Sequence, residues 1–157
     1  MRKQKGFSLI ELLIVVAIIL IIAAIAIPNL LRSRMAANEA SAVGSIRTIN
    51  TAEVTYASTY NTIGFTDLAA LGGTGTTASS TSALLIDSVL STAPNQKSGY
   101  TFAVAGFTGT PTVTYTVTGV PITVGQTGQR GFFSDQSGVI RQTTDGTAPT
   151  VSSPSLQ

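Results

Sequence analysis

The chain has 157 residues, of which 43% are hydrophobic and 10% charged, and its formal net charge is +2. This length accommodates one modest domain besides an N-terminal apolar segment. Histidine and cysteine are absent, which excludes Ser-His-Asp and Cys-His catalysis, the usual zinc sites and disulfide bonds.

The basic character of the chain comes from its first five residues. Arg2, Lys3 and Lys5 are three of the nine basic side chains, and without them six basic residues stand against seven acidic ones. The sequence pI of about 9.2 therefore indicates no nucleic-acid partner.

An apolar run, Leu12 to Ile27, follows this basic start. Between Phe7 and Pro28 the only charged side chain is Glu11. A run of about 20 apolar residues spans a bilayer as a helix. A charge near the centre of such a helix costs at least ~2.5–3.5 kcal/mol and somewhat less near an end, so we expect Glu11 to have a partner.

Two common kinds of N-terminal segment remain possible for this apolar run. One is an ordinary single-pass anchor, and the other is a conventional secretory signal with an Ala-x-Ala cleavage site at Ala24–Ala26. The anchor has no use for Glu11, and the secretory signal would have a long apolar region with a carboxylate near its start. The basic residues ahead of the span outnumber Arg32 and Arg34 behind it, which favours a cytoplasmic N-terminus and an outer C-terminal domain.

Beyond the apolar run the sequence predicts an amphipathic continuation of the helix over residues 29–63. Pro28 predicts a kink or loosening around Ala24–Pro28. After it, apolar residues recur at helical spacing, and Glu53 falls on the same stripe. The stripe consists of Ala42, Ile46, Ile49, Tyr56 and Tyr60. A small domain cannot bury so long a helix, so its N-terminal half needs lipid or sister subunits.

Residues 64–99 are expected to connect this helix to a sheet. Thr66 to Gly72 predicts a short helical turn with Thr66 as its N-cap. Gly73 to Ser82 is a Gly/Thr/Ser-rich loop. Ala83 to Leu90 predicts a second short helix or a buried segment.

Residues 100–142 alternate with period two, which predicts short antiparallel strands. The apolar positions are Tyr100, Phe102, Val104, Val113, Tyr115, Val117, Ile122, Val124, Phe132, Phe133, Val139 and Ile140. Residues 143–157 lack periodicity, which predicts an irregular, exposed tail. The predicted fold class is α+β, with a long N-terminal helix packed on a small antiparallel sheet.

The order of a basic leader, Gly6, Phe7 and then Ser-Leu-Ile-Glu-Leu-Leu-Ile-Val-Val-Ala-Ile-Ile resembles the N-terminal signal of type IV pilins and type II secretion pseudopilins. The resemblance implies that a prepilin peptidase removes residues 1–6 by cleaving between Gly6 and Phe7, and N-methylates Phe7. It further implies that residues 7–28 drive polymerisation, with local unwinding of the helix near Pro28 as one possibility. Many type IV pilins close their C-terminal region with a disulfide, which this chain lacks, so other contacts must hold that region.

The expected function is that of a structural filament subunit with no catalytic residues, cofactor or metal. Asp135 and Asp145 are too few for a convincing calcium site and fit ordinary turns. The leading role is a type IV pilin for adhesion, motility or DNA uptake. The alternatives are a pseudopilin acting in protein export and a membrane-anchored envelope binding domain that never polymerises.

The partners that the resemblance implies are sister subunits, the prepilin peptidase, an inner-membrane assembly platform and a secretin. The expected location is the inner membrane for the precursor, as a single-pass protein, and then an extracellular pilus or periplasmic pseudopilus. In such a filament, Glu11 of one subunit would pair with the Phe7 amine of a neighbour.

Overall fold

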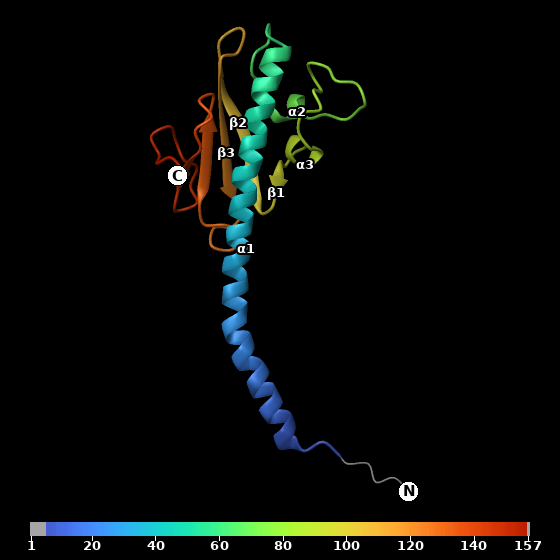
Figure 1. The fold of residues 1–157 in the computed structure, drawn as a ribbon, viewed down its shortest axis with the longest axis vertical. Coiled ribbons are helices and arrows are strands. Elements are labelled where there is room, and N and C mark those ends of the chain that lie inside the picture. Colours follow the sequence, from blue (N-terminus) through green and yellow to red (C-terminus); the bar gives the residue numbers. More distant parts are fainter. Residues whose placement is uncertain (1–5, 157) are drawn as a thin grey trace. The chain divides into compact units, whose positions relative to one another are not determined.

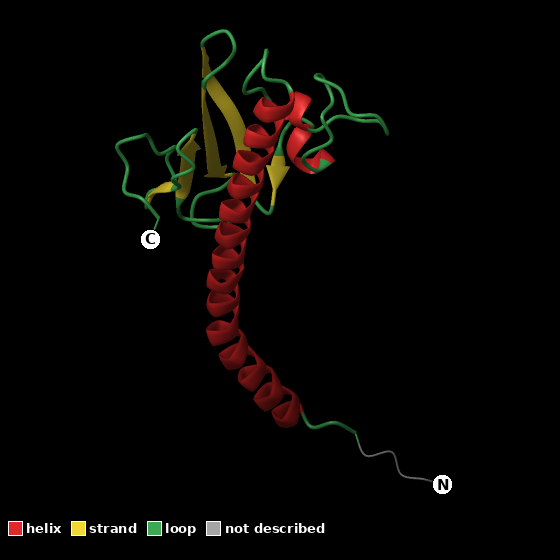
Figure 2. Ribbon diagram, turned by 45° about the horizontal axis from the view of Figure 1, so that its top comes forward, coloured by secondary structure: helices red, strands yellow, loops and turns green. Residues whose placement is uncertain are grey.

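The structure, a computed structural model, describes residues 6–156. The basic residues Arg2, Lys3 and Lys5 therefore lie outside the described part of the chain. The described elements follow in order (Figure 1) (Figure 2): α1 (Leu9–Thr59), α2 (Leu68–Leu71), α3 (Ser88–Ser91), β1 (Gln96–Lys97), β2 (Tyr100–Thr108), β3 (Thr114–Pro121), β4 (Gly131–Asp135) and β5 (Arg141–Thr143). The predicted α+β class is confirmed.

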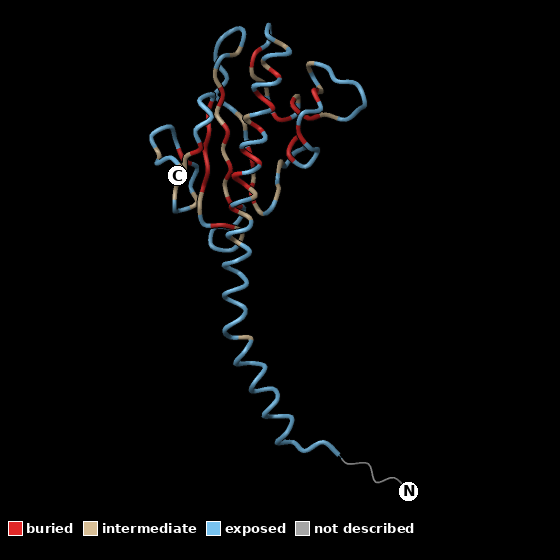
Figure 3. The backbone as a smooth tube through the Cα atoms, in the orientation of Figure 1, coloured by how far each residue is buried: buried red, intermediate tan, exposed pale blue. Residues whose placement is uncertain are grey.

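The chain divides into two compact units, residues 1–34 and 35–157, and α1 begins in the first and ends in the second. In the first unit every large apolar residue from Phe7 to Leu31 is exposed, and Figure 3 colours most of this part of the chain pale blue, as exposed. Among the described residues, α1 is the one helix long and apolar enough to cross a membrane. The helix continues past Pro28 without a break in its assignment. Because proline has no N–H, the carbonyl of Ala24 loses its usual partner there, and loosening at this point stays a prediction.

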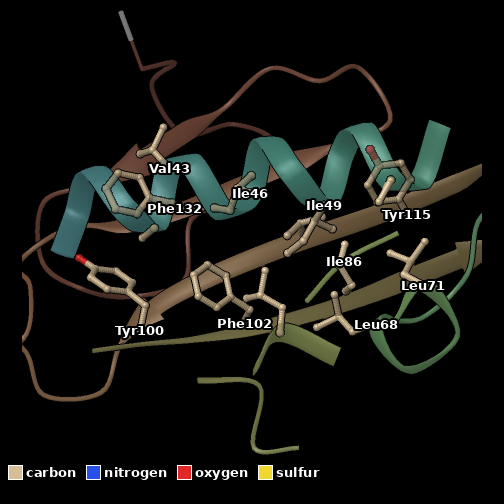
Figure 4. Packing of buried hydrophobic residues seen from close by; sticks show 14 of the residues in the cluster. Val43, Ile46, Ile49, Leu68, Leu71, Ile86, Tyr100, Phe102, Tyr115 and Phe132 are labelled. Atoms are coloured by element: carbon tan, nitrogen blue, oxygen red, sulfur yellow. The ribbon is translucent and has the colours of Figure 1, made fainter. Parts of the chain in front are cut away.

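The core of the second unit lies between α1 and the sheet. The predicted stripe of α1 is confirmed: Ala42, Ile46, Ile49 and Tyr56 are buried, and Tyr60 packs against the core half-buried. Figure 4 shows how this face of the helix meets aromatic side chains of the sheet. The main partners from the strands are Tyr100, Phe102, Tyr115, Val117 and Phe132.

The sheet has the order β1-β2-β3-β4-β5, and each strand is antiparallel to its neighbours. In β3 the buried positions Tyr115, Val117, Gly119 and Pro121 alternate with half-buried ones, as expected for a strand with one face on a core. All five residues of β4 are buried.

Parts of the strand prediction are wrong. Val113, Ile122 and Val124 lie outside the strands, and their side chains are 60%, 49% and 48% exposed. Val139 and Ile140 precede β5 instead of forming a strand. These residues lie in the segments between the strands, where an apolar side chain at every second position does not mean that the backbone is part of the sheet ladder.

The connection between α1 and the sheet also differs from its prediction. Asp67, not Thr66, caps α2, because its carboxylate accepts a hydrogen bond from the backbone N–H of Ala70 at 2.8 Å. Asp87 caps α3 in the same way through Leu90. The second short helix is therefore α3 at Ser88–Ser91. It begins inside the predicted stretch Ala83–Leu90 and ends one residue after it.

The C-terminal residues are attached to the edge of the sheet without a covalent bridge. The Leu156 N–H donates to the Ile140 carbonyl at 2.7 Å, and the Gln142 N–H donates to the Pro154 carbonyl at 2.9 Å. The Arg141 guanidinium adds a bond to the Ser153 carbonyl at 3.0 Å. These contacts hold the region that a disulfide closes in many type IV pilins.

Candidate processing and assembly site

Gly6, Phe7 and Ser8 precede α1 as non-helical, exposed residues. A Cβ atom built on Gly6 meets no heavy atom within 4 Å, and its φ lies outside the left-handed region that favours glycine. The described fold therefore places no demand for glycine at this position. Any such demand must come from a molecule that recognises this segment.

Glu11 lies in the first turn of α1 and bonds to the residue just before the helix. The backbone N–H of Ser8 donates to Oε2 of Glu11 at 2.9 Å. This is one half of a capping box, in which the third residue of a helix satisfies a backbone donor at the helix start. A carboxylate here also interacts favourably with the helix dipole.

The sequence analysis missed this contact, although Ser8-Leu9-Ile10-Glu11 ahead of an apolar run is the signature of a capping box. The partner expected for Glu11 was the Phe7 amine of a neighbouring subunit, and this bond within the chain was not predicted. The partner is a neutral amide, however, so the negative charge of Glu11 is not balanced by it. Glu11 therefore has a capping role, with its charge still available to a cation.

In the second unit a different carboxylate, Glu39, fastens the β3–β4 connection to α1. Its Oε1 accepts hydrogen bonds from the backbone N–H groups of Gln129 at 2.9 Å and Arg130 at 3.1 Å. Its Oε2 forms an ion pair with Nε of Arg130 at 2.8 Å. Burial alone would raise the pKa of Glu39, but the bonds from Gln129 and Arg130 and the Arg130 charge outweigh it, so the pKa lies below its usual range.

Arg130 is itself held from three sides. Its Nη1 donates to the side-chain oxygen of Gln142 at 2.9 Å, and its guanidinium lies 5.5 Å from the centre of the Phe132 ring. Its carbonyl accepts from the Tyr100 hydroxyl at 2.8 Å. The Glu39–Arg130 pair thus ties α1 to strands that follow it by about 90 residues, and no local sequence pattern signals such a pair.

We expect Glu39→Ala to destabilise the second unit by about 3 kcal/mol, because it leaves a partly buried guanidinium and two backbone N–H groups without their acceptor. Glu39→Gln keeps one acceptor oxygen and should cost less. Denaturant unfolding of the detergent-solubilised chain measures both. Because the folded pKa is depressed, the gap between wild type and Glu39→Ala should be present at neutral pH and shrink below about pH 4. An equal gap at all pH values would contradict an ionic role.

The carboxylates considered for calcium serve turns. Oδ1 of Asp135 accepts from the Ser137 N–H at 2.9 Å, and Oδ1 of Asp145 accepts from the Thr147 N–H at 3.1 Å. Within residues 6–156 no group of three or more acidic side chains is placed to hold a metal ion.

These features define an α+β protein with a long N-terminal helix whose exposed apolar half begins with the capping carboxylate Glu11. A family model described as the prokaryotic N-terminal methylation motif matches residues 1–27. The resemblance to type IV pilins and pseudopilins is thereby confirmed.

Three similar proteins illustrate this resemblance. The "Type IV wide pilus major component PilA4" of Thermus thermophilus is 67% identical over 39 residues, which are 25% of this chain and 30% of that protein. The "Type IV major pilin protein PilA" of Myxococcus xanthus is 43% identical over 54 residues, 34% of this chain and 24% of that protein. A "Fimbrial protein" of Pseudomonas aeruginosa is 40% identical over 88 residues, 48% of this chain and 57% of that protein.

The matches thus span less than two thirds of each of these relatives. No solved structure matches the chain.

Proposed function

We propose that this chain is a prepilin whose mature form is a structural subunit of a type IV pilus. The observation that carries the proposal is the first half of α1, where all large apolar side chains from Leu9 to Leu31 are exposed and Glu11 is the only charged residue. So large an apolar surface is unfavourable in water. The membrane covers it in the precursor, and the corresponding helices of sister subunits cover it in the filament.

Maturation begins with removal of residues 1–6 by a prepilin peptidase, which then methylates the new amine of Phe7. The match to the methylation motif over residues 1–27 supports this step. So does Gly6, whose identity the fold of the chain does not require. A peptidase pocket that admits no side chain before the cut explains why glycine stands there.

Assembly then depends on the charge of Glu11. Its bond to Ser8 uses one carboxylate oxygen and leaves the charge unbalanced. In a filament of parallel, axially staggered helices, Glu11 reaches the Phe7 amine of a neighbouring subunit, and methylation leaves that amine charged. A different axial offset between neighbouring helices leaves the Glu11 carboxylate and the Phe7 amine unpaired in apolar surroundings. The ion pair between them therefore fixes the offset of one subunit relative to the next.

In this proposal each segment of the chain has its own role. Residues 7–28 anchor and polymerise, and Pro28 permits local loosening of the helix. Residues 29–63 carry the globular part, in which residues 64–99 connect the helix to the sheet of residues 100–142, followed by the tail of residues 143–157. The protein is not an enzyme, and adhesion, motility or DNA uptake would be functions of the assembled filament.

The precursor resides in the inner membrane with its C-terminal domain outside, and it meets an assembly platform there. The filament leaves the cell through a secretin. The relatives named above are pilus or fimbrial proteins, which favours a pilus over the pseudopilus of a secretion system.

The test of this function is the protein content of surface filaments. Cells that produce the chain should yield, after shearing, filaments in which this chain is a constituent, and deletion of its gene should remove it and reduce the filament yield. A control fraction of unsheared membranes shows the precursor pool. Filaments of unchanged yield that lack this chain, with the chain confined to membranes, would contradict the proposal.

A further inference from the structure

Glu53 is the second carboxylate on the core face of α1, and its surroundings differ from those of Glu39. Its side chain is completely buried, at 0% exposure. Oε2 accepts a hydrogen bond from the backbone N–H of Thr66 at 3.0 Å. Oε1 is buried with no hydrogen-bond partner among the described residues.

The groups that face Glu53 give it no positive charge. Tyr56 lies on its own helix, Asp67 lies in the segment that enters α2, and Tyr115 lies on β3. Asp135, from β4, adds a further carboxylate near Tyr115. In the described part of the chain the two ion pairs are Lys97–Asp87 and Arg130–Glu39, and neither includes Glu53.

The Thr66 contact lies just after the turn that ends α1. Gly64 has a φ of +84°, and a Cβ atom there would lie 2.0 Å from the Thr112 carbonyl oxygen. Backbone bonds from Thr112 to Ile63 and from Phe65 to Thr112 fix this turn against the β2–β3 hairpin. The segment after this turn, residues 66–71, is therefore fixed at its N-terminal end by the turn. Its other contacts hold it against α1.

Beyond Thr66 the attachment of this segment is mainly apolar. Leu68 and Leu71 are buried in the core, and Leu71 also accepts a backbone bond from Leu85 at 2.8 Å. The bond from Thr66 to Glu53 is thus a polar link between α1 and the residues that lead into α2. An ionised Glu53 has one charged oxygen that is buried and has no donor beside it among the described residues. Movement of residues 66–71 away from α1 would expose that oxygen to solvent and so relieve the cost of burying its charge.

We propose that Glu53 is a proton-dependent latch, which holds residues 66–71 against α1 when its carboxyl group is neutral and weakens that attachment when it is ionised. This inference concerns the fold of the second unit and holds whether or not the chain assembles into a filament.

The direction of the effect follows from linkage. Burial, the largest cause, and the nearby charge of Asp67 raise the pKa of Glu53 to about 7, against the bond from Thr66, which lowers it. In the unfolded chain the carboxyl titrates near 4.5. The folded state therefore binds the proton more tightly, and its stability falls as pH rises from about 4.5 through 7.

The experiment is hydrogen exchange of the detergent-solubilised full chain at several pH values between 5 and 8, corrected for the intrinsic rate of exchange. Opening at residues 66–71 should rise on the order of 10- to 100-fold across this range in the wild type. Glu53→Gln keeps an acceptor for Thr66 and cannot ionise, so its opening should not depend on pH. Asp67→Asn, which retains the cap of α2, should remain pH-dependent.

The wild-type measurement alone can overturn the proposal, even if the Glu53→Gln chain folds poorly. A wild-type opening at residues 66–71 that does not change with pH would overturn it. A pH dependence that persists in Glu53→Gln, or that disappears in Asp67→Asn instead, would do so as well.

Discussion

Replacement of Glu11 by valine should leave the chain membrane-inserted and cleaved after Gly6 but reduce its recovery in sheared filaments at least about tenfold. The reason is that each subunit would then place the charged Phe7 amine in an apolar environment without its partner, and breaking a buried charge pair typically costs about 3–5 kcal/mol. The ratio of filament protein to cleaved membrane protein measures the effect, in cells that lack the wild-type chain.

The bond between Ser8 and Glu11 requires a second variant, because valine removes a helix cap as well as a charge. Glu11→Gln retains an oxygen that can accept from the Ser8 N–H but has no charge. If the ion pair sets assembly, Glu11→Gln should fail nearly as severely as Glu11→Val. Assembly of Glu11→Gln at the parental level would assign Glu11 to capping alone, and parental assembly of Glu11→Val would refute both roles.

Gly6→Val should accumulate as uncleaved precursor in the membrane, with processed protein reduced by at least about tenfold. A branched side chain would have to enter the proposed peptidase pocket, whereas the chain's own structure has open space around Gly6. The mass of the membrane-bound protein distinguishes the two forms.

Gly44→Ala is the matched control for this variant, since a Cβ at Gly44 also meets no atom within 4 Å. It lies within α1, where alanine should stabilise the helix by about 1 kcal/mol. Its processing should equal that of the wild type. Normal cleavage of Gly6→Val would show that the residue before the junction is not read by a peptidase.

Sequence patterns predicted the part of the fold that depends on local periodicity. The stripe of Ile46, Ile49 and Tyr56 is a 3.6-residue repeat, and it marks the buried face of α1 correctly. Alternation also located β2, β3 and β4. It failed at Ile122 and Val139, because alternation alone does not show whether a neighbouring strand is present to pair with.

The contacts that fix the second unit were not predictable in the same way. Glu39 meets Arg130 across 91 positions of sequence, and such a pair follows from the register of helix and sheet. Glu53 was visible as a charged residue on an apolar stripe, but only its burial and its bond to Thr66 suggest a role. The capping bond of Glu11 was predictable from Ser8 three residues before it, but it was not predicted.

The most direct test of the proposed maturation and assembly is the intact mass of the subunit in native surface filaments. Cleavage after Gly6 and N-methylation predict a subunit that begins at Phe7 and carries one added methyl group on its N-terminal amine. A filament-free protein that begins at Ile27 would establish a conventional secretory signal, and a membrane protein that retains residues 1–6 would establish a simple anchor. Either result would contradict the proposed maturation and assembly.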